Sequence, residues 1–183
     1  MPFFVVGCWM VTNIKKIWSK AEIMKILVTG SRGYLGSSFI NQYSDKYNFE
    51  NFSLLCQKIK DVNFNNIDIV LHCAALVHQK VEHPYDKYYE VNVEYPVKLA
   101  KLAKENGVKQ FVFISTIAVY GEDEEKLTEN TVCNPVTPYG KSKLKAEKEL
   151  LKLRDDNFIV SIINIGVWPN IGVWPYYETF VDF

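Results

Sequence analysis

The fold class of this chain follows from residues 25–36, KILVTGSRGYLG. A short run of Ile, Leu and Val leads directly into a turn that carries Gly30, Gly33 and Gly36, and a segment typical of a helix follows. Glycines at this spacing let the chain turn sharply, let the backbone approach a pyrophosphate, and let the helix pack close to the strand. The N–H groups and positive dipole end of that helix would face the phosphates. The context of strand, turn and helix favours a dinucleotide-binding turn over a glycine-rich turn without a ligand.

The apolar pattern around this stretch predicts strands that alternate with helices. Strands are expected at 25–30, 67–75, 110–116 and 158–166, with a weaker one at FSLLC, 52–56, and helices at 33–45, 85–106 and 137–153. Such an alternation indicates a parallel sheet covered on both faces. The link from Gln57 to Ile67 is too short for a crossover helix, which needs about 10–12 residues, so a loop is expected there. We therefore predict an α/β fold over residues 24–166, a doubly wound, Rossmann-like parallel sheet.

The glycine turn does not by itself distinguish NAD from NADP. An NAD site often has an acid at the end of the second strand, about 20 residues after the glycines, to hold the ribose hydroxyls. Here that position reads Cys56-Gln57-Lys58, and the first acid is Asp61. Arg32 could meet the 2′-phosphate of NADP together with Lys58, or it could simply be solvated. The expected cofactor is NAD or NADP, bound by Gly30, Ser31, Arg32, Gly33, Tyr34, Leu35 and Gly36.

Composition and charge argue against several classes of protein. Lys+Arg 21 against Asp+Glu 21 gives a net charge of zero, so no basic face for nucleic acid is expected. No apolar run approaches the ~20 residues of a membrane helix. The four widely spaced cysteines indicate reduced thiols, and the three histidines lack the spacing and partners of a metal site. We expect a cytoplasmic protein with no metal, nucleic acid or membrane partner.

Residues 1–23 precede Met24, which opens MKILVTG. Their lysines follow the apolar run, whereas a secretory signal has the opposite order. We expect an N-terminal extension outside the fold, with an ordered extra strand as the alternative.

Taken together, the motifs resemble those of the extended short-chain dehydrogenase/reductase family, the nucleotide-sugar epimerases and dehydratases. They occur in the family's order and cover roughly residues 24–165: TGSRGYLG (29–36), HCAALVH (72–78), YYEVNVE (88–94), FVFISTIAVYG (111–121) and TPYGKSK (137–143). The resemblance implies an NAD(P)-dependent enzyme with a nucleotide-sugar substrate. It adds Ala74, Ala75, Asn92 and Lys143 to the cofactor site, and a homodimer is among the assemblies it allows. HCAALVHQ is most similar to branches that act on UDP- or dTDP-sugars in surface-polysaccharide synthesis.

Tyr139, Lys143 and Thr116 are the candidate catalytic residues. Tyr139 and Lys143 lie four apart on one expected helix and share a face, and Thr116 ends a strand at the edge where open α/β sheets bind ligands. A cation about 5 Å away would lower a tyrosine pKa by about two units at an effective dielectric of 20. Tyr139 could then take a proton from a sugar hydroxyl while hydride passes to the nicotinamide, with Thr116 holding the reacting oxygen. Lys143 would bind the nicotinamide ribose, as the resemblance implies. The alternatives are Ser115 in place of Thr116, and a capped helix with solvated charges.

Two features depart from the family's pattern. Asn92-Val93 is followed by Glu94-Tyr95-Pro96, and Pro96 should kink or restart the helix. NIGVWP at 164–169 repeats at 170–175, and a truncated tail, 167–183, stands where the family has its substrate-binding C-terminal region. Two hypotheses follow. The chain is an NAD(P)-dependent epimerase, dehydratase or reductase of nucleotide sugars, or it is a non-catalytic dinucleotide-binding module or inactive fragment of such an enzyme.

Overall fold

The computed structural model describes residues 23–54, 57–77, 83–121 and 131–166, which form one five-stranded sheet. Its strands are β1 (Lys25–Thr29), β2 (Asn48–Phe52), β3 (Ile69–His72), β4 (Gln110–Thr116) and β5 (Ile159–Ile165). All pairings are parallel, and the order across the sheet is β2-β1-β3-β4-β5. The order of the strands therefore reverses between β1 and β3, and open α/β sheets bind ligands at the carboxyl ends of the strands beside such a reversal.

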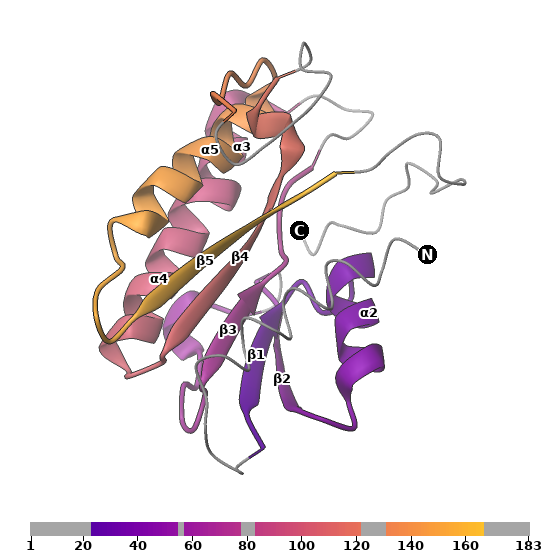
Figure 1. Ribbon diagram of the computed structural model, residues 1–183, viewed down its shortest axis with the longest axis vertical. Helices are drawn as coiled ribbons and strands as arrows, with labels where there is room; N and C mark the ends of the chain where they lie inside the picture. The colour runs from indigo at the N-terminus through magenta and orange to yellow at the C-terminus, as the bar shows by residue number, and fades with distance from the viewer. Residues whose placement is uncertain (1–22, 55–56, 78–82, 122–130, 167–183) are drawn as a thin grey trace.

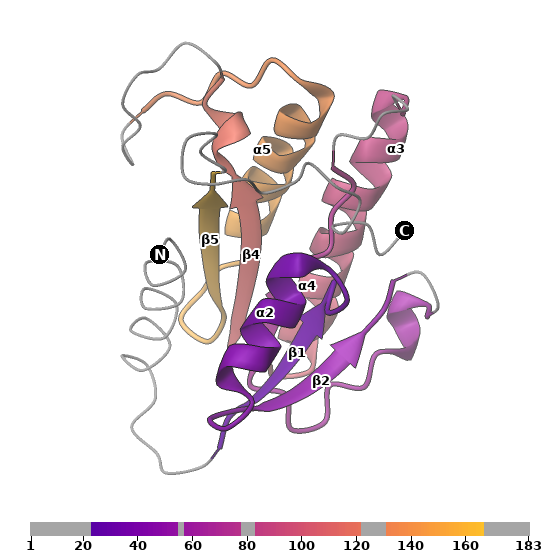
Figure 2. The same ribbon diagram turned by 90° about the vertical axis from the view of Figure 1, so that its right-hand side faces the viewer.

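Helices cover both faces of the sheet, as predicted (Figures 1 and 2). One face is covered by α2 (Tyr34–Tyr43), and the other by α3 (Tyr85–Tyr89), α4 (Tyr95–Glu105) and α5 (Pro138–Leu151). The doubly wound, Rossmann-like fold is therefore confirmed.

Alternate residues of each strand point to opposite faces and so build two cores. The core under α2 contains Ile26 and Val28 of β1, whereas the core under α4 and α5 contains Leu27. Phe111 and Phe113 of β4 belong to this second core and are fully buried. Because both faces are covered, the central strands show the continuous apolar runs that made them visible in the sequence.

The segment predicted as helical over 85–106 consists of three parts. A π-helical turn, η2 (Glu90–Glu94), joins α3 to α4, and Pro96 lies in the first turn of α4. In a first turn the missing N–H of a proline costs no helical hydrogen bond. The expected restart of the helix at Pro96 is confirmed, whereas the π turn was not expected.

The weak strand expected at 52–56 is wrong, because β2 occupies Asn48–Phe52. Among the described residues this strand pairs only with β1 and lies at the edge of the sheet, so most of its side chains are partly exposed. An edge strand needs no continuous apolar run, and for this reason NFENF gave a weaker signal than the more apolar residues that follow. A short 3₁₀ helix, η1 (Ile59–Asp61), lies between β2 and β3, in the link where no crossover helix was expected.

Some expectations lie outside the described residues, namely the N-terminal extension and the tail at 167–183 with the second copy of NIGVWP. Within the described ranges, no helix has the length and apolar character needed to cross a bilayer.

Candidate active site

The glycine turn follows β1 directly, and its backbone packs against the chain that leaves β3. Gly30 has a φ of +68°, and a Cβ atom on it would lie 2.7 Å from the Ala74 nitrogen and 2.9 Å from the Cys73 carbonyl carbon. A Cβ atom on Gly36 would collide with the carbonyl oxygen of Gly30. Both positions therefore require glycine. The predicted residue Ala74 lies buried against Gly30, and the predicted Ala75, which follows it, is also buried.

The N-terminus of α2 is suited to an anion. Gly33 is the N-cap residue, no side chain caps the helix, and the first turn has no acidic residue. The Gly33 N–H donates to the Gly30 carbonyl at 3.1 Å and closes the turn. The remaining N–H groups at a helix start, together with the helix dipole, favour a phosphate there. The pyrophosphate of a dinucleotide fits this donor set. Of the other predicted residues, Ser31, Tyr34 and Leu35 are half-buried.

Arg32 links the glycine turn to the end of β2. Its Nη2 donates to Ser53 Oγ at 3.5 Å across the surface. Because β2 ends at Phe52, the position at which many NAD sites carry an acid is Ser53, and the sequence-based choice of Cys56-Gln57-Lys58 was wrong. Asp61 in η1 is still the first acid after this strand.

Asn92 lies in the π turn, and its side chain serves the protein backbone. Its Oδ1 accepts from the Leu76 N–H at 2.8 Å, and its Nδ2 donates to the Leu76 carbonyl at 2.9 Å. The same Nδ2 donates to Ser142 Oγ at 3.0 Å, which ties the segment after β3 to α5. These hydrogen bonds use the amide within the protein, so in this structure Asn92 positions the wall of the site.

Tyr139 stands in the first turn of α5, at the carboxyl end of β4. Thr137 caps this helix through its Oγ1, which accepts from the Gly140 N–H at 3.0 Å. A Cβ atom on Gly140 would lie 2.6 Å from the Ala118 carbonyl oxygen, so the helix start packs closely on the turn after β4. The Thr116 side chain lies close enough to the Tyr139 phenol to lower its pKa. Ser115, the alternative to Thr116, instead donates a hydrogen bond to Glu147.

The charge on Lys143 does not act on Tyr139 as expected. Burial raises the pKa of Tyr139 to about 12, and the nearby Thr116 side chain offsets only part of this rise. The Lys143 ammonium donates to the Ile114 carbonyl at 2.7 Å and lies 3.8 Å from the centre of the Phe113 ring. The predicted lowering of the Tyr139 pKa is therefore wrong for this structure, because Lys143 is held on the β4 backbone.

Lys143 is fully buried, and burial lowers its pKa to about 7. One turn later on the same face of α5 lies a carboxylate, Glu147, which is also buried and accepts a hydrogen bond from Ser115. The sequence analysis missed Glu147. The available signal was its spacing, since Lys143, Glu147 and Leu150 recur at helical intervals on the face that meets the sheet. Four lysines on the outer side of α5 are exposed: Lys141, Lys145, Lys148 and Lys152.

His72 ends β3 and is a core residue. Its Nδ1 is hydrogen-bonded to Thr29 Oγ1 at 2.9 Å, and its ring stacks on those of Phe111 and Phe113. Burial lowers its pKa to about 3, with a further contribution from the charge of Lys143. In the described part of the chain, no three His, Cys, Asp or Glu side chains are grouped so that they could hold a metal ion.

A parallel sheet with a glycine turn at its switch point, and with Thr116, Tyr139 and Lys143 around the end of β4, defines a Rossmann-like dinucleotide-binding protein. The chain belongs to the NAD-dependent epimerase/dehydratase family, whose model matches residues 44–173. The match includes Thr116, Tyr139 and Lys143, whereas β1 and the glycine turn precede it.

Individual relatives agree with this family. The chain is 34% identical over 164 residues to a UDP-glucose 4-epimerase of Vibrio cholerae, with 75% of this chain and 49% of that protein covered. It resembles the solved structure of a dTDP-4-dehydrorhamnose reductase from Clostridium acetobutylicum, with 31% identity, a TM-score of 0.62 and coverage of 76% and 52%. A short-chain dehydrogenase/reductase superfamily protein from Agrobacterium tumefaciens, solved with NAD bound, gives 26% identity, a TM-score of 0.66 and coverage of 76% and 48%. The chain thus spans about half the length of the relatives it matches.

Proposed function

We propose that this chain binds NAD or NADP and contributes the cofactor-binding and catalytic residues for epimerisation, dehydration or reduction of a UDP- or dTDP-sugar. One observation carries the proposal. The α2 N-terminus, with its glycine turn, lies at the same edge of the sheet as the neighbouring pair Thr116 and Tyr139. A non-catalytic binding module would need the turn but not the pair.

In this proposal the residues of the chain divide the work. The backbone of Gly30–Gly36 holds the pyrophosphate, and Lys143 binds the nicotinamide ribose. A bound nicotinamide dinucleotide supplies a hydride acceptor and donor. Thr116 orients the reacting sugar oxygen, and Tyr139 exchanges a proton with it. With a pKa of about 12, the Tyr139 phenol keeps its proton at neutral pH and is set as a proton donor. To accept a proton it needs a nearby cation, which Lys143 supplies only after leaving the Ile114 carbonyl.

Cofactor binding is tested by titrating the protein with NADH and NADPH and following the fluorescence of the reduced nicotinamide. We expect saturable binding, and Arg32→Ala should weaken NADPH binding more than NADH binding if Arg32 meets a 2′-phosphate. Equal weakening of NADH and NADPH binding would show that Arg32 is solvated and does not bind a 2′-phosphate. Absence of binding to either cofactor would contradict the proposal.

Turnover separates the enzyme from the binding module. UDP-glucose, UDP-galactose and dTDP-sugars are incubated with the protein and with Tyr139→Phe, and products are resolved by chromatography. Loss of the Tyr139 proton donor should lower turnover by about 10²–10⁴-fold. Background activity in both proteins, with cofactor binding intact, would support the second candidate, a non-catalytic dinucleotide-binding module. We retain this second candidate because the chain matches only about half the length of its relatives.

A further inference from the structure

Behind Tyr139 lies a buried carboxylate, that of Glu147, which the proposed chemistry does not use. Lys143 and Glu147 are one turn apart on the face of α5 that packs on β4, and 1% and 8% of their surfaces are exposed. The Ser115 hydroxyl donates to Glu147 Oε1, and the Lys143 ammonium donates to the Ile114 carbonyl. Both charged side chains are therefore tied to consecutive residues of β4, directly before Thr116.

Stability alone gives little reason for this arrangement. Two buried charges repay their desolvation only with excellent geometry, and an apolar pair of similar volume often stabilises a protein equally well. The same buried face of α5 also carries Ala146 and Leu150, which are fully buried. The carboxylate instead favours the charged form of Lys143, because burial lowers the Lys143 pKa and the charge of Glu147 raises it.

The other charged and titratable groups around the pair do not replace this carboxylate. On the sheet side lie Cys73 and His72, and burial keeps both neutral, since it raises the pKa of Cys73 to about 12 and lowers that of His72 to about 3. On α5 itself Tyr139 is a neutral phenol, and Lys148 adds a positive charge that acts on Glu147. In the segment before α5, burial raises the pKa of the Cys133 thiol, and the nearby Glu147 carboxylate raises it further.

We propose that Glu147 is a positioning residue that holds Lys143 as an ammonium ion at the carboxyl end of β4, beside Thr116 and Tyr139. Ser115 supports this role by donating to the carboxylate, which counteracts the rise that burial causes in the Glu147 pKa. The inference rests on the proposed function, because the charge of Lys143 matters for binding the ribose and for lowering the Tyr139 pKa. It adds two supporting residues, Glu147 and Ser115, which lie behind the candidate catalytic residues.

The charge on Lys143 can be measured without cofactor or substrate. In the full chain labelled with ¹³C-lysine, the ¹³Cε shift of Lys143 is followed from about pH 5 to about pH 10, across the expected titration range. The resonance is assigned by its loss in Lys143→Met. Glu147→Gln keeps the size of the side chain and its acceptor for Ser115 but removes the charge. Its titration midpoint should lie about one pH unit or more below the wild-type value of about 7.

Glu149→Gln is the matched control, because it removes one carboxylate from the outer face of the same helix. Its Lys143 midpoint should equal that of the wild type. An unchanged or higher midpoint in Glu147→Gln would overturn the inference, as would an equal shift in both variants. Should circular dichroism show that Glu147→Gln is unfolded, Ser115→Ala provides the second test. Without its hydrogen-bond donor the carboxylate is ionised less readily, so the Lys143 midpoint should again fall, and an unchanged midpoint would count against the inference.

The same measurements distinguish this inference from the proposed function. If the protein shows no turnover but Glu147→Gln lowers the Lys143 midpoint, the enzymatic proposal is contradicted and the role of Glu147 in keeping Lys143 charged is supported. If the protein turns over sugars but the Lys143 midpoint is the same in all variants, the enzymatic proposal is supported and the inference about Glu147 is contradicted.

Discussion

Gly30 and Gly107 share a positive φ but lie in different surroundings. Gly30 has a φ of +68° and backbone atoms of Cys73 and Ala74 where a Cβ atom would stand. Gly107 follows α4 with a φ of +78°, and nothing lies within 4 Å of its Cβ position. At Gly107 glycine is required by the backbone conformation alone, whereas at Gly30 it is also required by the close approach of two chain segments. The sequence indicates both as turn glycines but cannot tell them apart.

Gly30→Ala should therefore destabilise the protein more than Gly107→Ala. The left-handed conformation alone costs an alanine about 1–2 kcal/mol, the value expected for Gly107→Ala in urea unfolding. Overpacking against backbone adds about 1–3 kcal/mol, so Gly30→Ala should lose about 2–5 kcal/mol. Equal losses in the two variants would contradict the close packing of the glycine turn against the segment after β3.

His72 should make the stability of the protein depend on pH below neutrality. Its pKa is about 3 in the folded protein, whereas an unfolded histidine has a pKa of about 6.5. Between these values the unfolded chain binds the extra proton, so the free energy of unfolding falls as the pH is lowered from about 6.5 toward 3, by a few kcal/mol at most. Subtracting the curve of His72→Gln from that of the wild type isolates this contribution. His83→Gln is the control, and a difference curve without slope in this window would show that His72 is not buried as a neutral ring.

At the scale of elements, the sequence predicted those segments whose pattern reflects burial on both sides. β4 was predicted within its observed bounds, because every residue of QFVFIST is buried. β2 was placed too late, because an edge strand with partly exposed side chains carries no such pattern. The π turn before Pro96 was missed, since its residues have the same apolar spacing as a regular helix over so short a length. The hydrogen bonds from Asn92 to Leu76, which occur in this turn, depend on contacts far apart in the sequence.

The start of α5 gives a prediction at this scale. Thr137→Ala removes the acceptor of the Gly140 N–H and should lower the free energy of unfolding by about 1 kcal/mol. Thr137→Ser keeps the hydroxyl and should retain most of the stability. Because the cap orients the first turn, Thr137→Ala should also lower turnover more than its effect on stability explains, if the proposed role of Tyr139 is right. Loss of stability in both variants to the same extent would assign the effect to the threonine methyl group instead of the cap.

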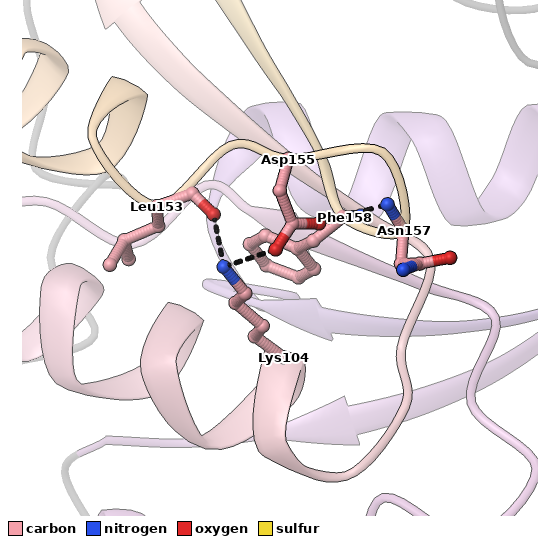
Figure 3. Close-up of polar contacts among 5 residues, drawn as sticks. All are labelled: Lys104, Leu153, Asp155, Asn157 and Phe158. Carbon is pink, nitrogen blue, oxygen red and sulfur yellow. Dashed lines mark hydrogen bonds and ion pairs between the residues drawn. The ribbon is translucent and has the colours of Figure 1, made fainter.

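At the scale of the whole molecule, α4 and the α5–β5 connection are joined at the end of the sheet opposite the candidate site. The Lys104 ammonium donates to the Leu153 carbonyl at 2.8 Å and lies 2.6 Å from Asp155 Oδ2 (Figure 3). The other carboxylate oxygen of Asp155 accepts from the N–H groups of Asn157 and Phe158 at 2.8 and 2.9 Å. One carboxylate therefore both shapes the turn into β5 and anchors it to α4.

Asp155→Asn should lower the melting temperature, because it removes the charge that holds Lys104 while leaving an acceptor for the turn. Lys104 and the two N–H groups lower the pKa of Asp155, so its contribution to stability is present above the unfolded pKa of about 3.9 and is lost as the pH falls through the lower folded value. The melting temperatures of wild type and Asp155→Asn should thus converge in acid. Asp156→Asn, on the exposed neighbouring carboxylate, serves as the control, and an equal change in both variants at neutral pH would contradict the anchor.

The sequence by itself determined the class of fold, the glycine turn and the identity of Thr116, Tyr139 and Lys143 as candidates, because buried strands, turn glycines and helical spacing leave local patterns. Only the tertiary structure decided which groups meet. It placed Ser53 beside Arg32, and it brought Ser115 from β4 onto Glu147 of α5. It also turned Lys143 toward the Ile114 carbonyl and left the Tyr139 pKa high. The physical reason is that burial and electrostatic pairing depend on distances between elements, and these distances are set by the packing of α5 on the sheet.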